Sequence, residues 1–420
     1  MIFDELDSLE AARTKIKVIG VGGAGKNAID HMIENDVQGV EFIAVNTDAQ
    51  DLKYCKARKR LLIGRNTTRG HGAGADPNVG RMAALESEDD IREMISDADM
   101  VFITCGMGGG TGTGAAPVIA RIARENDCLT VGICTKPFLF EGPERMNNAF
   151  TGLTELREYV DTLIVIPNQR LLQIVDPSTP MLDAYREADN VLRKGVQGIS
   201  EIISVPGMIN VDFADVKHVM ANSGTALMGI GAASGPNRAL EAARKAIHSS
   251  LLEVTIDGAT NAIVNFTASE SLAAREIEIA LAEIRNNCDK DLDIIYGTAY
   301  NNDLGDEMIV TVVATGYELK AKSYGYSEIA SEIYKNFDEE NISLNSYKTS
   351  SFDDETETVD EPVTESEKKA EEIFGFKRSR REEKLRIKEE KQQKKLEQKQ
   401  QQEPAPTINV GLPSWLKKKN

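Results

Sequence analysis

A glycine-rich stretch at residues 105–114 constrains this chain more than any other feature of its sequence. It follows the apolar run 100–103 and precedes a helix-like stretch at 115–124. Glycine has no Cβ, so backbone N–H groups stay accessible along such a stretch, and the start of the following helix adds positive potential. A strand, a glycine turn and a helix in this order predict a phosphate-binding loop. A flexible linker is the alternative, but linkers are rarely flanked by an apolar strand and an amphipathic helix.

Length and composition allow two domains of ordinary size. The 420 residues are 41% hydrophobic and 28% charged, which is enough for two separate cores. No apolar run approaches the ~18 residues of a membrane span, and the N-terminus is acidic where a signal peptide would be basic. The five cysteines form no C-x-x-C pair, which predicts reduced thiols and no zinc site. We therefore expect a cytoplasmic protein, and its net charge of −18 argues against nucleic acid as a partner.

The first half of the chain alternates short apolar runs with helical stretches. Several of the runs are apolar almost throughout, as in a parallel sheet that is covered on both faces. Ligands of such sheets bind beyond the carboxyl ends of the strands, and the glycine-rich segments 20–25, 70–74 and 106–114 fall at or near strand ends. We predict an N-terminal extension at 1–15 and a Rossmann-like α/β domain at 16–180. Its expected strands are 16–21, 40–45, 60–63, 100–104, 129–135 and 162–166.

The second half predicts a helical connection, a smaller domain and a tail. A helix at 181–205 would span about 36 Å at 1.5 Å per residue, and it leads into an α+β domain at 206–318. Residues 319–405 carry an acidic and then a basic block with almost no apolar stripe, which predicts a disordered linker. Residues 406–420 regain apolar side chains, as a partner-docking peptide would. Expected strands of the second domain are 226–232, 262–267, 293–299 and 308–314, with helices at 238–250 and 272–285.

The first glycine segment fits two kinds of nucleotide site. Residues 20–25 match G-x-G-x-x-G, the dinucleotide fingerprint, for which Glu41 or Asp48 would be the later acidic residue. The same segment followed by Lys26 is close to a P-loop, but Asn27 replaces the Ser or Thr whose hydroxyl binds Mg²⁺. Neither kind of site explains a second, larger loop with Thr111 and Thr113. Two or three backbone loops around one pocket suit a triphosphate.

Residues 108–114, Gly-Gly-Gly-Thr-Gly-Thr-Gly, are similar to the tubulin signature. Across residues 15–317 the chain resembles the FtsZ family of bacterial tubulin-like cell-division GTPases. Further segments that carry this resemblance are 20–27, 46–50, 72–75, 135–138, 166–168 and 210–215.

The resemblance implies a site for GTP or GDP on the first domain. Asn168 and Asp189 would bind guanine, with Tyr185 stacked on its face where many relatives have Phe. Pro137, Glu141 and Arg145 match positions near the ribose and phosphates. Mg²⁺ is expected on the phosphates rather than on protein side chains, with K⁺ a further candidate cofactor. The residues expected around the phosphates are Gly22, Gly23, Gly25, Asn27, Ala73, Gly74, Ala75, Gly108, Gly109, Gly110, Thr111 and Gly112.

The candidate catalytic residues are Asp212 and Asp215, assisted by Asn210. On spacing alone a structural role is favoured, because Asp212 and Asp215 also fit the N-cap and third position of a helix. The resemblance implies that this loop enters the pocket of the next subunit, so that hydrolysis requires a head-to-tail homopolymer. It further implies a filament at the mid-cell division site. A dinucleotide-dependent enzyme and a scaffold without turnover are the alternatives.

The C-terminal peptide resembles the short adaptor-binding tail of the family. Its apolar residues are Leu412, Pro413, Trp415 and Leu416. It differs from the family in lacking an acidic residue just upstream and in having Trp where Phe is common. A membrane-anchoring adaptor such as FtsA is the expected partner, together with other division proteins. Direct insertion of the tryptophan into anionic lipid is the alternative.

Overall fold

The computed structural model describes residues 14–316, except 174, 177, 205–208, 210, 250–255, 257 and 289–291. These residues belong to one compact unit, Met1–Glu339. The predictions for the N-terminal extension, Asn210, the charged linker and the C-terminal peptide lie outside the described residues. Among the described helices, none has the length and apolar character that a membrane span requires.

The first part of the unit is a parallel sheet, as the apolar runs predict. Its strands lie in the order β3-β2-β1-β4-β5-β6, and every neighbouring pair is parallel. The bounds are β1 Ile16–Val21, β2 Val40–Asn46, β3 Lys59–Leu62, β4 Met100–Gly106, β5 Leu129–Lys136 and β6 Thr162–Pro167.

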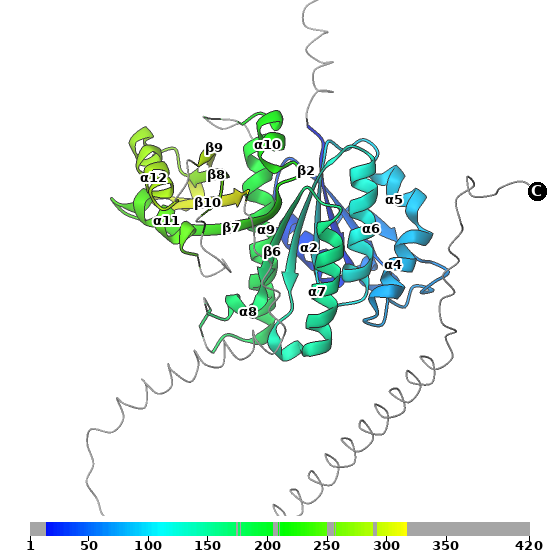
Figure 1. The fold of residues 1–420 in the computed structure, drawn as a ribbon. Coiled ribbons are helices and arrows are strands. Elements are labelled where there is room, and N and C mark those ends of the chain that lie inside the picture. The colour runs from blue at the N-terminus through cyan, green and yellow to red at the C-terminus, as the bar shows by residue number, and fades with distance from the viewer. Residues whose placement is uncertain are drawn as a thin grey trace, which may run out of the picture. The chain divides into compact units, whose positions relative to one another are not determined.

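Helices cover both faces of this sheet (Figure 1). Alternate strand residues enter two separate cores: Val18 and Phe102 belong to one cluster, whereas Ile19 and Ile103 belong to the other. This explains why the strands are apolar throughout, since both faces are buried. The helices are α2 Gly22–Glu34, α3 Ala49–Lys53, α4 Pro77–Glu86, α5 Glu88–Ile95, α6 Thr111–Glu125, the 3₁₀ turn η2 Leu139–Glu141, α7 Pro143–Arg157 and α8 Asn168–Leu171.

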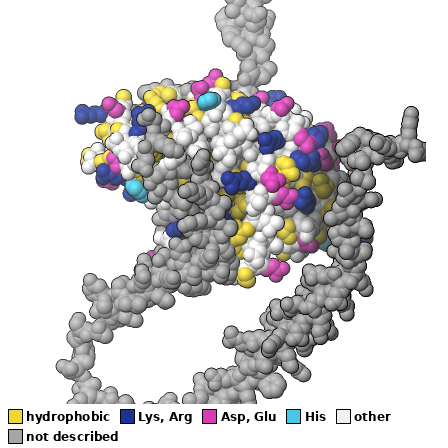
Figure 2. Space-filling model, viewed as in Figure 1, with side chains coloured by type: hydrophobic (Ala, Val, Ile, Leu, Met, Phe, Trp, Pro, Cys, Tyr) yellow, Lys and Arg dark blue, Asp and Glu magenta, His cyan; other side chains and the backbone are white. Residues whose placement is uncertain are grey.

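The surface of α5 and α6 is covered with ion pairs. Arg92 and Arg121 each contact both Glu88 and Glu125, at distances from 2.6 to 3.0 Å. Figure 2 shows basic and acidic side chains interspersed on the visible face of the described surface. The two arginines therefore neutralise the two glutamates and join α5 to α6.

The long helix α9, Met181–Ser204, packs between the first sheet and the C-terminal strands. Val191, Val196 and Ile199 are buried in the same core cluster as strands of the first sheet. Two glycines let the C-terminal strands approach: a Cβ on Gly195 would lie 3.1 Å from Met228 Sδ, and one on Gly198 would lie 2.9 Å from Thr311 Cγ2. The helix predicted at 181–205 is thus present, and it is a core element.

The C-terminal part is an α+β arrangement, as predicted. β10 is antiparallel to β7 and β8, and β9 is parallel to β8. β7 also pairs with β6, so the two parts share one ten-stranded sheet, a continuity that the sequence analysis did not predict. The bounds are α10 Phe213–Met220, β7 Gly224–Ala233, α11 Arg238–Ile247, β8 Asn261–Ala268, α12 Ala274–Asn286, β9 Asp293–Tyr300, η3 Asn302–Leu304 and β10 Met308–Thr315.

Candidate nucleotide-binding site

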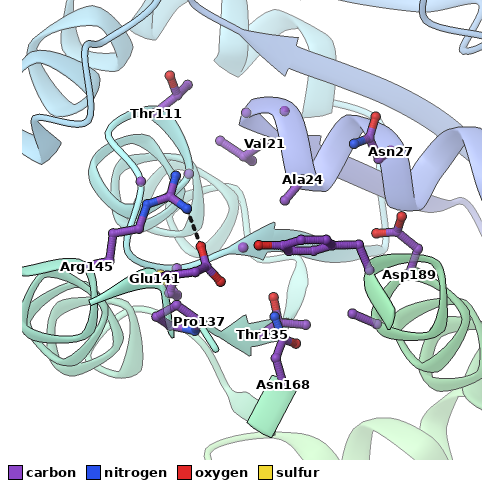
Figure 3. Close-up of a pocket in the computed structure, with 18 of the residues that line it drawn as sticks. Val21, Ala24, Asn27, Thr111, Thr135, Pro137, Glu141, Arg145, Asn168 and Asp189 are labelled. Atoms are coloured by element: carbon purple, nitrogen blue, oxygen red, sulfur yellow. Dashed lines mark hydrogen bonds and ion pairs between the residues drawn. The ribbon is translucent and has the colours of Figure 1, made fainter. Parts of the chain in front are cut away.

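The pocket lies where the strand order reverses, beyond the carboxyl ends of the strands. β1 has β2 on one side and β4 on the other, and open α/β sheets bind ligands at such a point. A cavity of about 320 Å³ opens there. In Figure 3, Asn27 of α2, Thr135 of β5, Arg145 of α7 and Asp189 of α9 converge on it. The lining residues are Val21, Gly22, Gly23, Ala24, Asn27, Gly106, Met107, Gly109, Gly110, Thr111, Gly112, Thr135, Pro137, Glu141, Arg145, Asn168, Tyr185, Ala188, Asp189 and Leu192.

The helices α2 and α6 begin at this cavity without side-chain caps. By contrast, Asp48 caps α3 and Asp76 caps α4, each accepting from backbone N–H groups. Within the described chain, no side chain caps α2 or α6, and neither first turn holds an acidic residue. Their first N–H groups and their positive ends therefore remain available to an anion in the pocket. Two such helix ends at one cavity suit the phosphates of a nucleotide.

The glycines in these turns allow the two helix ends to approach each other closely. Gly22 has φ +71°, and a Cβ on it would lie 3.0 Å from the Gly112 nitrogen. A Cβ on Gly112 would lie 2.8 Å from the carbonyl oxygen of Gly106. Any side chain here would push α2, α6 and β4 apart. The glycine pattern thus serves packing between the loops as well as access to the ligand.

Asn168 supplies an unsatisfied acceptor at the other end of the pocket. The residue is only 5% exposed, and its Oδ1 has no hydrogen-bond partner among the described residues. A buried polar atom without a partner costs free energy unless a ligand or water satisfies it. The Asn168 amide is therefore suited to accept a hydrogen bond from a bound base.

Asp189 and Tyr185 lie on one face of α9 beside Asn168. Burial raises the pKa of the Asp189 carboxyl to about 7; the negative charge of Asp30 adds to this shift and Lys26 opposes it. The Tyr185 ring packs edge-on against Phe138, with 5.1 Å between centroids. Burial, together with the Glu141 carboxylate, raises the pKa of the Tyr185 hydroxyl. The nearby Glu141 is the polar partner that this hydroxyl requires.

Glu141 and Arg145 form an ion pair on the pocket wall, marked by the dashed line in Figure 3. Glu141 Oε1 also accepts a hydrogen bond from the backbone nitrogen of Phe138 at 2.9 Å. The carboxylate is thereby fixed where a hydroxyl-bearing ligand can reach it, and the guanidinium adds positive charge near the helix ends.

Most of the predicted binding residues line the cavity, and five do not. Ala73 packs against Gly110, because a Cβ on Gly110 would lie 2.7 Å from the Cβ of Ala73. A Cβ on Gly25 would lie 2.5 Å from the Thr104 carbonyl oxygen, and one on Gly108 would lie 2.6 Å from the Arg145 carbonyl oxygen. These residues support the loops from behind. The five residues outside the lining are Gly25, Ala73, Gly74, Ala75 and Gly108.

Several lining residues were not named individually as binding residues from the sequence, although they carry a readable signal. Ala188 and Leu192 follow Tyr185 and Asp189 by three residues on α9, so helical periodicity places them on the same face. Gly106 ends β4, and a strand end beside the strand-order switch is where lining residues are expected. The missed residues are Val21, Ala24, Gly106, Met107, Thr135, Ala188 and Leu192.

The orientation of Lys26 argues against a P-loop. A P-loop lysine reaches the β- and γ-phosphates of the nucleotide. Here the Lys26 ammonium lies 3.0 Å from Asp30 Oδ2 and 3.5 Å from Asp51 Oδ1, and Lys26 does not line the cavity.

The candidate catalytic carboxylates lie away from this pocket. Asp212 and Asp215 are exposed, and Asp212 Oδ1 caps α10 by accepting from the Ala214 nitrogen at 3.3 Å. α10 follows the end of α9, whereas the pocket holds residues from the beginning of α9. Figure 1 shows α8 and α10 at opposite ends of α9. Within the described residues, no group of three or more His, Cys, Asp or Glu is placed to hold a metal ion.

Two family models match this chain. Residues 15–176 match the Tubulin/FtsZ family GTPase domain, and residues 224–318 match the FtsZ family C-terminal domain. An empty FtsZ dimer from M. jannaschii is 44% identical over 77% of this chain and 94% of that chain, with a TM-score of 0.73. The chain belongs to the FtsZ family. A mutant FtsZ from M. jannaschii, also 44% identical, covers 77% of this chain and 97% of that chain with a TM-score of 0.74.

A more distant structure extends the fold likeness. The GTPγS-bound CetZ2 protofilament from Haloferax volcanii is 20% identical over 77% of this chain and 100% of that chain, with a TM-score of 0.64. At that identity the likeness shows the fold alone. Membership in the FtsZ family confirms the resemblance and the fold class, and it makes the chain a GTP-binding GTPase of the tubulin/FtsZ type. The dinucleotide alternative is therefore wrong.

Proposed function

We propose that this FtsZ-family chain assembles head to tail into filaments and hydrolyses GTP at the contact between two subunits. The separation of the pocket from Asp212 and Asp215 carries this proposal. Among the described residues, two carboxylates line the pocket: Glu141 is paired with Arg145, and Asp189 lies on α9 with Tyr185, where the base is expected to bind. The uncapped ends of α2 and α6 therefore need a further carboxylate to orient water beside them. The exposed carboxylates lie at the far end of α9. A second subunit can supply them, and a head-to-tail contact that does not close on itself builds a filament.

In the proposed complex, the first turns of α2 and α6 bind the phosphates through backbone N–H groups. Glu141 accepts from the ribose hydroxyls, and Tyr185 lies against the face of the base. Asp189, when ionised, accepts from both N1–H and the exocyclic amine of guanine, while Asn168 offers its free Oδ1. Adenine lacks this pair of donors, so the same side chains give specificity for guanine.

In the proposed reaction, a water molecule attacks the γ-phosphorus and the bond to the β,γ-bridging oxygen breaks. Asp212 and Asp215 of the neighbouring subunit, assisted by Asn210, orient this water and take up its proton. Mg²⁺ bound by the phosphate oxygens would neutralise part of their charge. GTP favours the contact and hydrolysis weakens it. A K⁺ requirement stays an untested expectation.

Two relatives support the assembly, since the M. jannaschii FtsZ was solved as a dimer and the H. volcanii CetZ2 as a protofilament. By the same resemblance we propose that the filaments act in the cytoplasm at the mid-cell division site. An adaptor such as FtsA would attach them to the membrane through the C-terminal peptide.

Mixing two inactive variants tests whether the active site is shared. Asp212→Ala keeps an intact pocket, and Asp189→Ala keeps an intact catalytic loop. Asp212→Ala alone should hydrolyse GTP at least ~10²-fold more slowly than wild type, the usual scale of a lost acid–base group. Asp189→Ala alone should be slow at GTP concentrations too low to saturate its weakened pocket. Random mixing in equal amounts creates contacts with one intact pocket and one intact loop, so turnover should recover to about one quarter of the wild-type rate. A mixture no faster than the mean of its components would refute the shared site.

Asp212→Asn is the matched control, because Asp212 also caps α10. Asparagine is as good an N-cap as aspartate, whereas alanine costs about 1 kcal/mol of stability. If Asp212 acts in catalysis, Asp212→Asn restores the melting temperature but stays slow. Wild-type turnover in Asp212→Asn would reduce this residue to a helix cap. Wild type that binds GTP and forms filaments without releasing phosphate would instead be a scaffold.

A further inference from the structure

Lys26 bridges two carboxylates directly behind the first phosphate-binding turn. Its side chain is 12% exposed and those of Asp30 and Asp51 are 14% and 29% exposed. The ammonium lies 3.0 Å from Asp30, one helical turn along α2, and 3.5 Å from Asp51 on α3. Gly23 of the phosphate-binding turn adjoins this cluster, since a Cβ on it would lie 3.7 Å from Asp51 Oδ2. A partly buried ion pair of this kind is weakly screened and influences neighbouring charges.

From Asp51 the contacts continue to the second phosphate-binding turn. Asp51 Oδ2 accepts from Asn46 Nδ2 at 2.7 Å, and Asn46 Oδ1 accepts from the Thr47 nitrogen at 2.8 Å. Thr47 Oγ1 is 2.7 Å from Thr111 Oγ1, a buried hydroxyl contact at the start of α6. Since Thr111 lines the cavity, an unbroken series of polar contacts joins Lys26 to the pocket wall.

Two negative charges and one positive charge thus stand behind a site meant for an anion. Their influence reaches Asp189, because Asp30 raises the pKa of that carboxyl and Lys26 lowers it, in addition to the larger effect of burial. The other charged side chains around the cavity, Glu141 and Arg145, pair with each other.

Of the remaining titratable neighbours, Cys55 contacts the cluster directly, because its thiol donates to Asp30 Oδ1 at 3.3 Å and burial keeps the thiol neutral by raising its pKa to about 11. The residues of α9 are engaged elsewhere. On α9, Tyr185 is near Glu141, and Arg193 donates to Asn190 and Gln197. Among the described residues, Lys26 is therefore the cation that pairs with both Asp30 and Asp51 on this side of the pocket.

We propose that Lys26 is a positioning residue for the nucleotide pocket. By bridging Asp30 and Asp51 it holds α2 to α3, and it screens both the phosphates and the guanine-binding carboxylate from these two negative charges. The proposal rests on the proposed nucleotide site and deepens it. A P-loop lysine offsets phosphate charge by direct contact, whereas Lys26 would act from behind the pocket by neutralising the carboxylates there. The phosphates themselves would be bound by backbone N–H groups.

Lys26→Met tests the proposal, with GTPγS and GDP as probes in calorimetric titrations from about pH 6 to 8.5. We expect GTPγS to bind about tenfold more weakly at pH 7, equivalent to ~1.4 kcal/mol, and GDP to lose less because it carries less charge. We expect the pH midpoint of GTPγS affinity in wild type to follow the Asp189 carboxyl, whose pKa is about 7, and in Lys26→Met this midpoint should move upward. In Asp30→Asn it should move downward. A role confined to packing would leave both midpoints unchanged.

Matched variants separate charge from packing. Lys26→Met/Asp30→Asn/Asp51→Asn removes every charge of the cluster and should bind GTPγS more tightly than Lys26→Met does, since the repulsive carboxylates are gone. Any affinity still missing relative to wild type measures the lost bridge between α2 and α3. Lys26→Arg should retain wild-type binding. Lys56→Met removes a surface lysine that pairs with Glu34 and controls for a general change of net charge.

The proposal would be overturned if Lys26→Met kept the wild-type GTPγS affinity and pH midpoint. It would also be overturned if the triple variant bound GTPγS no more tightly than Lys26→Met does. Failure of wild type itself to bind GTPγS would refute the nucleotide site instead.

Discussion

In the proposed guanine site, Asp189 couples base recognition to pH. Its carboxyl is largely buried, and its pKa of about 7 means that the proton leaves near neutrality. The protonated form can accept from only one guanine donor, so binding must first remove the proton. Below pH 7 the carboxyl is mostly protonated, and above pH 7 it is mostly ionised. We therefore infer that GTP affinity rises as the pH rises through 7 and falls on the acid side.

Replacing Asp189 by Asn should change which base is preferred. An amide offers one acceptor and one donor, which matches the N1–H and O2 of xanthine, whereas guanine presents two donors. We expect Asp189→Asn to bind GTP at least ~10-fold more weakly and xanthosine triphosphate more tightly than wild type does. Competition titrations with the two nucleotides measure this ratio, and the variant should also lose the pH dependence near 7.

Asp189→Ala is the control for this exchange, because it removes the acceptor without supplying a donor. It should weaken both nucleotides without reversing their order. A variant with asparagine that still prefers GTP by the wild-type factor would show that another residue reads the base.

At the scale of elements, the contact between α4 and α6 fixes the second phosphate-binding turn. A Cβ on Gly114 of α6 would lie 1.9 Å from the Pro77 carbonyl oxygen of α4. Gly114→Ala should therefore destabilise the protein by about 1–3 kcal/mol, the usual cost of overpacking, despite the better helix propensity of alanine. Chemical denaturation measures this loss.

Gly109→Ala provides the contrast within the same loop. Nothing lies within 4 Å of a Cβ at Gly109, yet this residue lines the cavity. It should keep wild-type stability and lose GTP affinity, because the added methyl group enters the space of the phosphates. The reverse pattern, stable Gly114→Ala and unstable Gly109→Ala, would contradict this account of the loop.

The positions of helices and strands could be predicted from the sequence far better than the contacts between them. The six parallel strands and α9 follow from apolar runs and helical spacing, which are local properties. The pairing of β6 with β7 could not be predicted. It joins Ile164 to Ala226, which are far apart in the sequence, and local patterns carry no information about such distant pairs.

The same limit applies within the site. Glycine loops and base-reading residues were recognisable as motifs, and most of them line the cavity. The direction of Lys26 was not recognisable, since its motif fits a phosphate contact equally well. Only the fold places Asp30 and Asp51 around its ammonium. For Asp212 the sequence allowed a helix cap and a catalytic role. The structure shows the helix cap, and the role in catalysis stays a proposal.

At the scale of the whole molecule, the proposed function makes α9 the element that separates two incomplete halves of an active site. One end contributes Tyr185 and Asp189 to the pocket, and the other leads to the exposed Asp212. On this proposal, a single subunit binds nucleotide but lacks the carboxylates that orient water beside it. In this arrangement the rate of hydrolysis reports the number of contacts between subunits rather than the number of subunits.

Dilution separates this arrangement from a self-sufficient enzyme. Total phosphate release should rise more than linearly with protein concentration until filaments dominate, because each new contact creates an active site. GTPγS bound per subunit provides the control and should change far less over the same range, since each pocket is complete for binding. A rate per subunit that stays constant down to high dilution would place all catalytic groups in one chain. The exposed carboxylates at the start of α10 would then serve the helix alone.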